Sequence, residues 1–106
     1  MSALGTEFKI NVHAEPIDGF HMSDYDFECT LYTAFNKRVT YKKSDTVHVK
    51  ETDSDNYRII VTSDDCLKLG KGVVYLKFTA YIRDYDFEDN LRTEVVDRIC
   101  TGETIT

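Results

Sequence analysis

Three histidines have the chemistry closest to catalysis, because imidazole gains and loses a proton near neutral pH. They are His13, His21 and His48, and they are scattered along the chain. A nucleophilic enzyme also needs a serine or cysteine in a glycine-framed turn, with a base beside it. No serine stands in such a frame, and no cysteine has a base close to it in sequence. We therefore expect no active site and no enzymatic turnover.

One acidic segment makes the strongest case for a bound cation. Its acids are Asp84, Asp86, Glu88 and Asp89. Calcium takes about six to eight oxygen ligands, and alternating carboxylates in a loop can supply several of them. The segment lacks the sharp-turn glycine and the distal glutamate of a calcium-binding loop, so these residues are weak calcium candidates. We expect a solvated loop that packs Phe87 against the edge of the core, and no metal or other cofactor.

Tyrosine is the residue type that most strongly indicates binding. The chain has seven tyrosines, six phenylalanines and no tryptophan. Tyrosine gives an interface a large contact area at a small entropic cost. A core of this size cannot hold all of them, so some are expected to face a partner; the alternative is that they cover the polar side of the sheets. The interface candidates are Tyr25, Tyr32, Tyr57, Tyr75, Tyr81 and Tyr85.

The charge balance excludes several classes of partner. The 106 residues carry a net charge of −6, whereas nucleic acids and anionic membranes attract basic surfaces. The basic pairs Lys37-Arg38 and Lys42-Lys43 are too short to change this and are expected on a solvated face. No run of about 18 apolar residues is present, so no transmembrane helix is expected. The first residues lack the features of a signal peptide, which indicates synthesis in a cytoplasm.

The three cysteines fit neither a disulfide framework nor a zinc site, because their number is odd and their spacing is wide. They are Cys29, Cys66 and Cys100. We expect Cys29 and Cys100 to be small buried side chains.

Period-two alternation of apolar and polar residues dominates the chain and predicts strands. The predicted strands cover residues 8–14, 27–33, 39–41, 47–49, 57–62, 73–82 and 93–100. Before the longest apolar strand, Ser63 can cap a helical turn that Gly70 ends. About seven strands with a turn signal every 8–12 residues are typical of a Greek-key sandwich.

We therefore predict an all-β, immunoglobulin-like Greek-key sandwich of about seven strands with one short helical turn; a barrel is the alternative. The length fits a single domain over residues 1–106, with an N-terminal arm at 1–6 and a polar C-terminal tail at 103–106. The two termini and the sheet edges could add strands to an assembly. The segment Asp-Tyr-Asp-Phe-Glu occurs at 24–28 and again at 84–88, in flanks that do not match, so it is not a tandem repeat.

The strand ends and turns form a second pattern. It runs through Asp26-Phe27-Glu28, Leu31-Tyr32-Thr33, Ile60-Val61, Leu67-x-Leu69-Gly70-x-Gly72, Leu76, Asp84-x-Asp86-Phe87-x-Asp89-x-x-Arg92 and Thr101-Gly102-x-x-Ile105. It resembles the small immunoglobulin-like modules in virion proteins of Bacteroidales phages, at the base of tail or fibre proteins, over about residues 7–106. The family has Pro-Asp-Gly where this chain has Glu88-Asp89-Asn90, and asparagine can hold the left-handed position of such a turn.

The resemblance implies a structural virion protein that docks to other capsid, tail or fibre proteins by surface complementarity and strand addition. Its partners would be other virion proteins, and self-association is left open. Nucleic acid and membranes are not expected as partners. It would be made in the host bacterial cytoplasm and reside in the virion. The family's module usually begins a longer protein, whereas this chain stops at Thr106, so we expect a free-standing adaptor or decoration protein. The alternative is a carbohydrate- or ligand-binding β-sandwich of a gut bacterium, which the absence of tryptophan disfavours.

Overall fold

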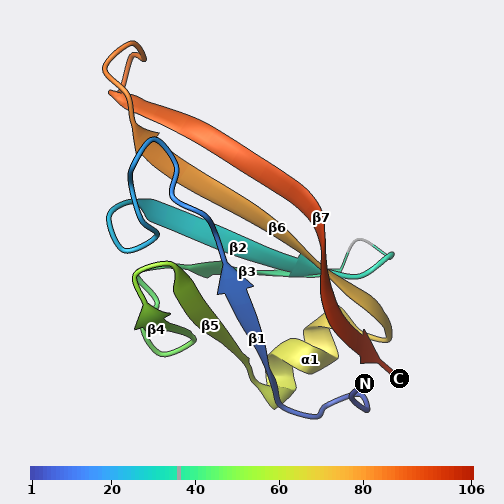
Figure 1. The fold of residues 1–106 in the computed structure, drawn as a ribbon. Helices are drawn as coiled ribbons and strands as arrows, with labels where there is room; N and C mark the ends of the chain where they lie inside the picture. The colour runs from blue at the N-terminus through green and yellow to red at the C-terminus, as the bar shows by residue number, and fades with distance from the viewer. Residues whose placement is uncertain (36) are drawn as a thin grey trace.

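Two antiparallel sheets and one short helix make up the fold (Figure 1), which a computed structural model describes for residues 1–35 and 37–106. The prediction of an all-β chain with a short helix is confirmed. The narrower sheet has the order β1-β5-β4, with bounds Phe8–His13, Asn56–Val61 and Val49–Asp53. The wider sheet has the order β3-β2-β6-β7, with bounds Arg38–Lys42, Asp26–Tyr32, Gly72–Arg83 and Leu91–Ile105.

The core lies between the two sheets and consists of the alternate strand residues that the sequence pattern predicts. In β6, every second residue from Val74 to Ile82 is at most 5% exposed. The Phe27 ring of β2 lies 4.9 Å from the Tyr57 ring of β5, centroid to centroid, so aromatic contact joins the two sheets. The central position predicted for the strand at 73–82 is confirmed, because β6 lies between β2 and β7.

The helix α1 (Ser63–Leu69) joins β5 to β6 and thereby connects the two sheets. Its N-cap is Thr62, one residue earlier than predicted, and the Thr62 hydroxyl accepts from the Asp65 backbone N–H at 3.3 Å. Cys66 and Leu69 face inward and are fully buried. The described residues include no helix that is long and apolar enough to cross a membrane.

In a constant-type immunoglobulin sandwich, the seven strands divide into one sheet of four and one of three, and variable-type domains add strands to the second of these sheets. Here the sheet of three holds β1, β5 and β4, and the sheet of four holds β3, β2, β6 and β7. The two-sheet all-β architecture is confirmed, whereas the immunoglobulin-like Greek-key order is not.

The two ends of the chain pair with each other, at the lower right of Figure 1. The Ser2 backbone N–H donates to the Thr104 carbonyl at 2.8 Å, and the Thr106 N–H donates to the Ser2 carbonyl at 2.7 Å. Ile105 is 1% exposed and lies opposite Gly72 in the β6–β7 ladder. The last strand therefore continues well past its predicted end, and residues 103–105 belong to the sheet.

Two local predictions have opposite outcomes. Asn90 has a φ of 57°, the left-handed conformation expected at its position in the β6–β7 turn. Cys29 is buried as predicted, but the prediction of a buried Cys100 is wrong. Cys100 lies opposite Tyr75 in the ladder, on the outer face of the wider sheet, where no second layer covers it. All three cysteines are free thiols.

Candidate functional site: an open groove between the sheets

The two sheets differ in width, and the difference leaves part of the inner surface uncovered. The wider sheet ends at β7, whereas the facing sheet ends at β1. Val96 pairs with Phe78 and Ile99 pairs with Leu76 across the β6–β7 ladder, and paired residues point to the same face. The inner face of β7 therefore carries apolar side chains with no described strand opposite them. Val96 is accordingly 53% exposed.

A groove of about 320 Å³ lies at this uncovered position, between β1 and β7. One wall comes from β1 and the loop after it, and the other from the inner face of β6 and β7. The apolar residues that line the two walls include Val12, Ala14, Ile17, Phe78, Val96 and Ile99. Exposed apolar surface beside a free strand edge is typical of a protein-binding site.

Contacts between distant parts of the chain close the groove at both ends. At one end, Arg92 of β7 donates to Asp18 in the β1–β2 loop at 2.7 Å and to Asp84 at the end of β6 at 2.9 Å. At the other end, the N-terminal arm pairs with β7 through Ser2. The open edge between these contacts corresponds to β1, which has six residues.

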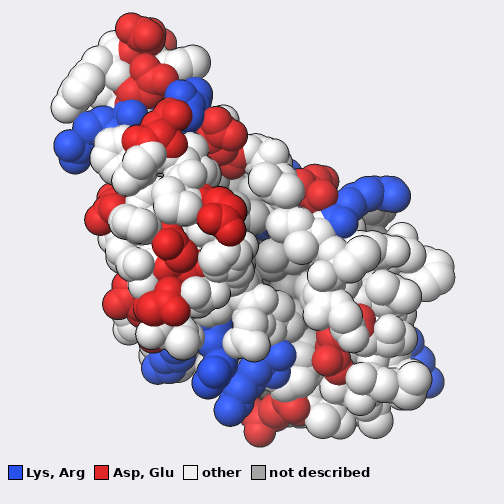
Figure 2. All heavy atoms as spheres, in the orientation of Figure 1, with Lys and Arg blue, Asp and Glu red and all other residues white. Residues whose placement is uncertain are grey.

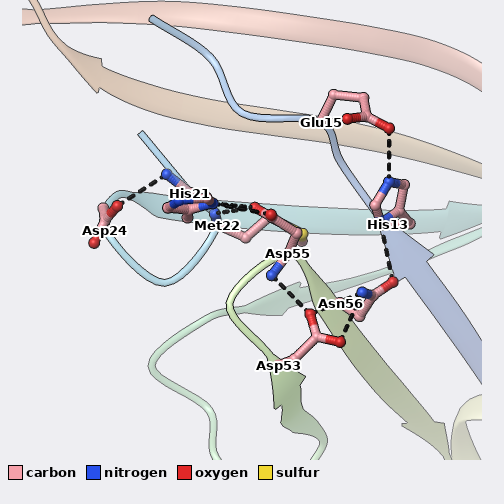
Figure 3. Close-up of polar contacts among 8 residues, drawn as sticks. All are labelled: His13, Glu15, His21, Met22, Asp24, Asp53, Asp55 and Asn56. Atoms are coloured by element: carbon pink, nitrogen blue, oxygen red, sulfur yellow. Dashed lines mark hydrogen bonds and ion pairs between the residues drawn. The ribbon is translucent and has the colours of Figure 1, made fainter. Parts of the chain in front are cut away.

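A histidine and a glutamate form the polar rim of the groove (Figure 3). His13 Nε2 lies 3.1 Å from Glu15 Oε1, and His13 Nδ1 lies 3.0 Å from Asn56 Oδ1. The Asn56 amide nitrogen donates to Asp53, so the Asn56 oxygen serves as an acceptor. Both ring nitrogens of His13 thus face acceptors. The hydrogen bond to Glu15, and then that to Asn56, raises the pKa of His13.

A second histidine ties the β1–β2 loop to the turn between β4 and β5 (Figure 3). His21 Nδ1 lies 2.9 and 3.0 Å from the two carboxylate oxygens of Asp55, and the His21 backbone N–H donates to Asp24 at 2.9 Å. The hydrogen bond to Asp55 raises the pKa of His21. A histidine oriented by a carboxylate also resembles a catalytic base, but no described serine, threonine or cysteine side chain is hydrogen-bonded to His21. The pair therefore holds a loop in place.

We expect the His21–Asp55 pair to stabilise the fold more at acidic than at alkaline pH. The pKa of His21 in the folded protein lies above its ordinary value of about 6.5. The contribution is therefore complete below about pH 6.5 and is lost as the pH rises through the folded pKa. The Tm difference between the wild type and His21→Gln should be larger at about pH 5.5 than at about pH 8.5. An NMR titration midpoint for His21 at or below about 6.5 would contradict this.

Two of the six predicted interface tyrosines lie in the core. Tyr25 and Tyr57 are each 5% exposed and pack around Phe27, so they offer no surface to a partner. Burial raises the pKa of Tyr25 to about 12. The reason is positional: Tyr25 directly precedes β2, and Tyr57 lies on the inward side of β5. Tyr85, by contrast, is 75% exposed in the β6–β7 loop.

Three other predicted tyrosines lie on the outer face of the wider sheet, away from the groove. The Tyr32 and Tyr75 rings stack at 5.8 Å between centroids, and the Tyr32 hydroxyl donates to Asp97 at 2.8 Å. The Tyr81 hydroxyl donates to Glu28 at 2.7 Å. The hydroxyl groups of Tyr32 and Tyr81 thus bond to other strands of the same sheet, which corresponds to the alternative that tyrosines cover the polar side of a sheet.

The acidic loop has no cation-binding arrangement among the described residues. Asp84 accepts from Arg92 and from the Asp86 backbone N–H, at 2.9 and 3.1 Å. Within residues 1–35 and 37–106, no group of three or more histidine, cysteine or acidic side chains is placed to hold a metal, and the candidates Glu88 and Asp89 join none. Phe87 is 48% exposed, so its predicted packing against the core edge is wrong. It stands in the turn of a hairpin that extends beyond the narrower sheet (Figure 1).

Lys43 fixes the end of the β1–β2 loop, a role that its sequence context does not indicate. Its Nζ donates to the carbonyl oxygens of Met22, Ser23 and Tyr25, at 3.0, 3.0 and 2.7 Å. The same nitrogen lies 5.7 Å from the centroid of the Phe27 ring. In the sequence, Lys43 is one half of a basic pair in a turn. Its three acceptors are backbone atoms, which carry no sequence signal.

A larger hollow lies at the other side of the β1–β2 loop. Its volume is about 580 Å³, and its lining includes the charged residues Asp24, Asp26 and Arg83. Because charged groups are costly to remove from water, a polar hollow of this kind is a weaker protein-docking site than the apolar groove. We therefore take the groove between β1 and β7 as the candidate site.

Comparison with known proteins identifies no relative. No protein-family model, no curated protein sequence and no solved structure matches the chain.

Proposed function

We propose that the chain is a protein-binding module of a bacteriophage particle, which docks to other capsid, tail or fibre proteins without catalytic turnover. One observation carries the binding part of the proposal: the inner face of β7, with Val96 and Ile99, lies uncovered beside the free edge of β1. Removing apolar surface from water is favourable by about 25 cal/mol per Å². A sandwich with one sheet a strand narrower than the other is therefore suited to receive part of another protein.

The resemblance to the virion modules of Bacteroidales phages supports the placement in a particle. The left-handed turn at Asn90 is compatible with the family's loop, in which glycine occupies that position. On this proposal the chain is immunoglobulin-like in the broad sense of a two-sheet antiparallel sandwich. It is made in the host bacterial cytoplasm and then incorporated into the virion.

Mass spectrometry of purified particles tests the placement. We expect the protein in gradient-purified virions produced by the genome that encodes it, at a fixed ratio to the major capsid protein across preparations. The control is a cytoplasmic host protein, which should disappear during purification. If this chain disappears with that control, the virion proposal is wrong.

A carbohydrate-binding sandwich is the second candidate, and one observation favours it. Tyr32, whose ring stacks on that of Tyr75, lines a hollow of about 280 Å³ together with Arg38 and Asp97. Aromatic rings beside charged and polar groups are a frequent surface for sugars. The two rings stack on each other, however, which leaves less of each face for a ligand. A glycan-array signal lost in Tyr32→Ala would favour this candidate, and absence of any signal would remove it.

A further inference from the structure

The free edge of β1 is regular and unpaired. Residues Phe8–His13 pair one for one with β5, without a register shift. No backbone hydrogen bond joins these residues to any described segment other than β5. Along the other side of such an edge strand, alternate backbone N–H and C=O groups have no partner, which makes the edge a template for another strand.

The edge of β7 is irregular over the same stretch. Register shifts interrupt its ladder with β6 between Val73 and Tyr75 and again between Leu76 and Phe78. The second shift falls near Arg98, whose φ is 56°. Such bulges bend an edge strand and interrupt a regular ladder. A partner strand is therefore favoured at β1 and disfavoured at β7.

We propose that the groove accepts one extended segment of a partner protein, which pairs with β1 as a fourth strand of the narrower sheet. Neighbouring strands lie about 4.8 Å apart and facing sheets about 10 Å apart, so this segment would lie opposite the inner face of β7. Its inward side chains would cover Val96 and Ile99. A segment paired with β7 would widen the wider sheet instead and leave the groove open. This inference rests on the proposed protein-binding function and deepens it.

The groove determines the chemistry of the segment. Its length is about that of β1, six residues, and its alternate side chains face the groove and are apolar. Glu15 and Glu94 lie in the lining; the Glu94 carboxylate is paired with Arg92 at 3.1 Å, whereas the Glu15 side chain is 86% exposed and available to a partner. In Figure 2, acidic side chains, interspersed with several basic ones, occupy the upper left of the face shown. The segment should therefore carry lysine or arginine at its end near Glu15.

A second copy of this chain is a poorer occupant. It would bring another net charge of −6 and the same carboxylates to the groove, and like charges repel. Its β1 has the required alternation, but Ile10 and Val12 of that strand are already 5% exposed in their own core. They have no free surface with which to fill a neighbour's groove. The occupant is therefore a different protein.

Synthetic peptides test the proposal directly on the full chain. The probe is an acetylated eight-residue peptide with lysine at both ends and valine alternating with threonine between them. One control has the same composition with its valines adjacent, and another carries N-methyl groups on alternate amides, which blocks pairing along one edge. By NMR, the probe should shift the backbone amides of β1 and the methyl groups of Val96 and Ile99. Both controls should bind at least tenfold more weakly.

Two adjacent valines give a matched pair of variants. Val96 and Val95 are 53% and 51% exposed, but Val96 faces the groove and Val95 faces outward, opposite Thr79. Val96→Asp should weaken binding of the probe at least tenfold, whereas Val95→Asp should leave the affinity within about twofold of the wild type.

Charge reversal at Glu15 tests the basic end of the segment. Since Glu15 is exposed and can be changed without unfolding, Glu15→Lys should weaken binding of the lysine probe and strengthen binding of a probe with glutamate ends. Three results would each overturn the inference. They are no shifts in β1 at millimolar probe, shifts confined to the outer edge of β7, or an equal loss of probe affinity in both valine variants.

The two proposals fail in different ways. If virions contain the Val96→Asp protein at the wild-type level, strand addition is wrong, while membership of the particle stands. If the peptide probe binds as expected but virions lack the wild-type protein, the groove is a strand acceptor in a protein outside the particle.

Discussion

Phe27→Ala should lower the free energy of unfolding by about 3–5 kcal/mol, the usual cost of truncating a buried aromatic side chain. Phe27 is 1% exposed, and its ring contacts those of Tyr25, Tyr57 and Phe78. Because these rings belong to both sheets, the truncation leaves a cavity that neither sheet can close alone. The total free energy of unfolding of a domain of this size is about 5–15 kcal/mol, so the variant should be only marginally stable at 37 °C.

The chain provides its own control for this experiment, Phe87→Ala. The repeated segment gives Phe87 the same three preceding residues and the same following residue as Phe27, but Phe87 is 48% exposed. Its truncation should cost less than about 1 kcal/mol. In thermal unfolding, Phe27→Ala should lower the Tm by at least about 12 °C, since about 4 °C is lost per kcal/mol. Equal Tm losses in the two variants would show that the core does not centre on Phe27.

The repeated segment also shows what alternation alone leaves undetermined. Both copies read Asp-Tyr-Asp-Phe-Glu, yet Tyr25 is 5% exposed and Tyr85 is 75% exposed. The first copy leads into β2, at the centre of the fold, whereas the second forms the turn of the β6–β7 hairpin. The difference comes from the residues that follow: an alternating apolar run after Glu28, and Asp89 and the left-handed Asn90 after Glu88.

The strands could be predicted from the sequence, but the groove could not. Alternation identifies which residues of a strand face inward, and it placed Val74 to Ile82 of β6 correctly in the core. It does not say which strands share a sheet, and the second strand here lies in the wider one. Val95 and Val96 are adjacent, so they break the alternation. Only the ladder with β6 shows which of them faces the groove.

Lys43→Met should lower the free energy of unfolding by about 2–3 kcal/mol, although the residue lies just beyond the end of β3. Its ammonium group donates to three carbonyls of the segment that leads into β2. Hydrogen bonds from a charged group contribute about 1.5–3 kcal/mol each, and water can replace part of this where the carbonyls are accessible. The attraction of the ammonium group to the Phe27 and Tyr57 rings is lost as well.

Lys42→Met separates this effect from a general loss of charge. Lys42 is exposed at the end of β3, and the same substitution there should change stability by less than about 0.5 kcal/mol. Methionine keeps a long apolar stem in both variants, so the comparison isolates the ammonium group. Urea unfolding measures both stabilities, and hydrogen exchange should show faster exchange of the Ser23 and Asp24 amides in Lys43→Met only. Equal stability losses in the two variants would mean that the three carbonyls do not depend on Lys43. Because this segment belongs to the loop that closes the groove through Asp18 and Arg92, loss of Lys43 should also weaken the peptide probe.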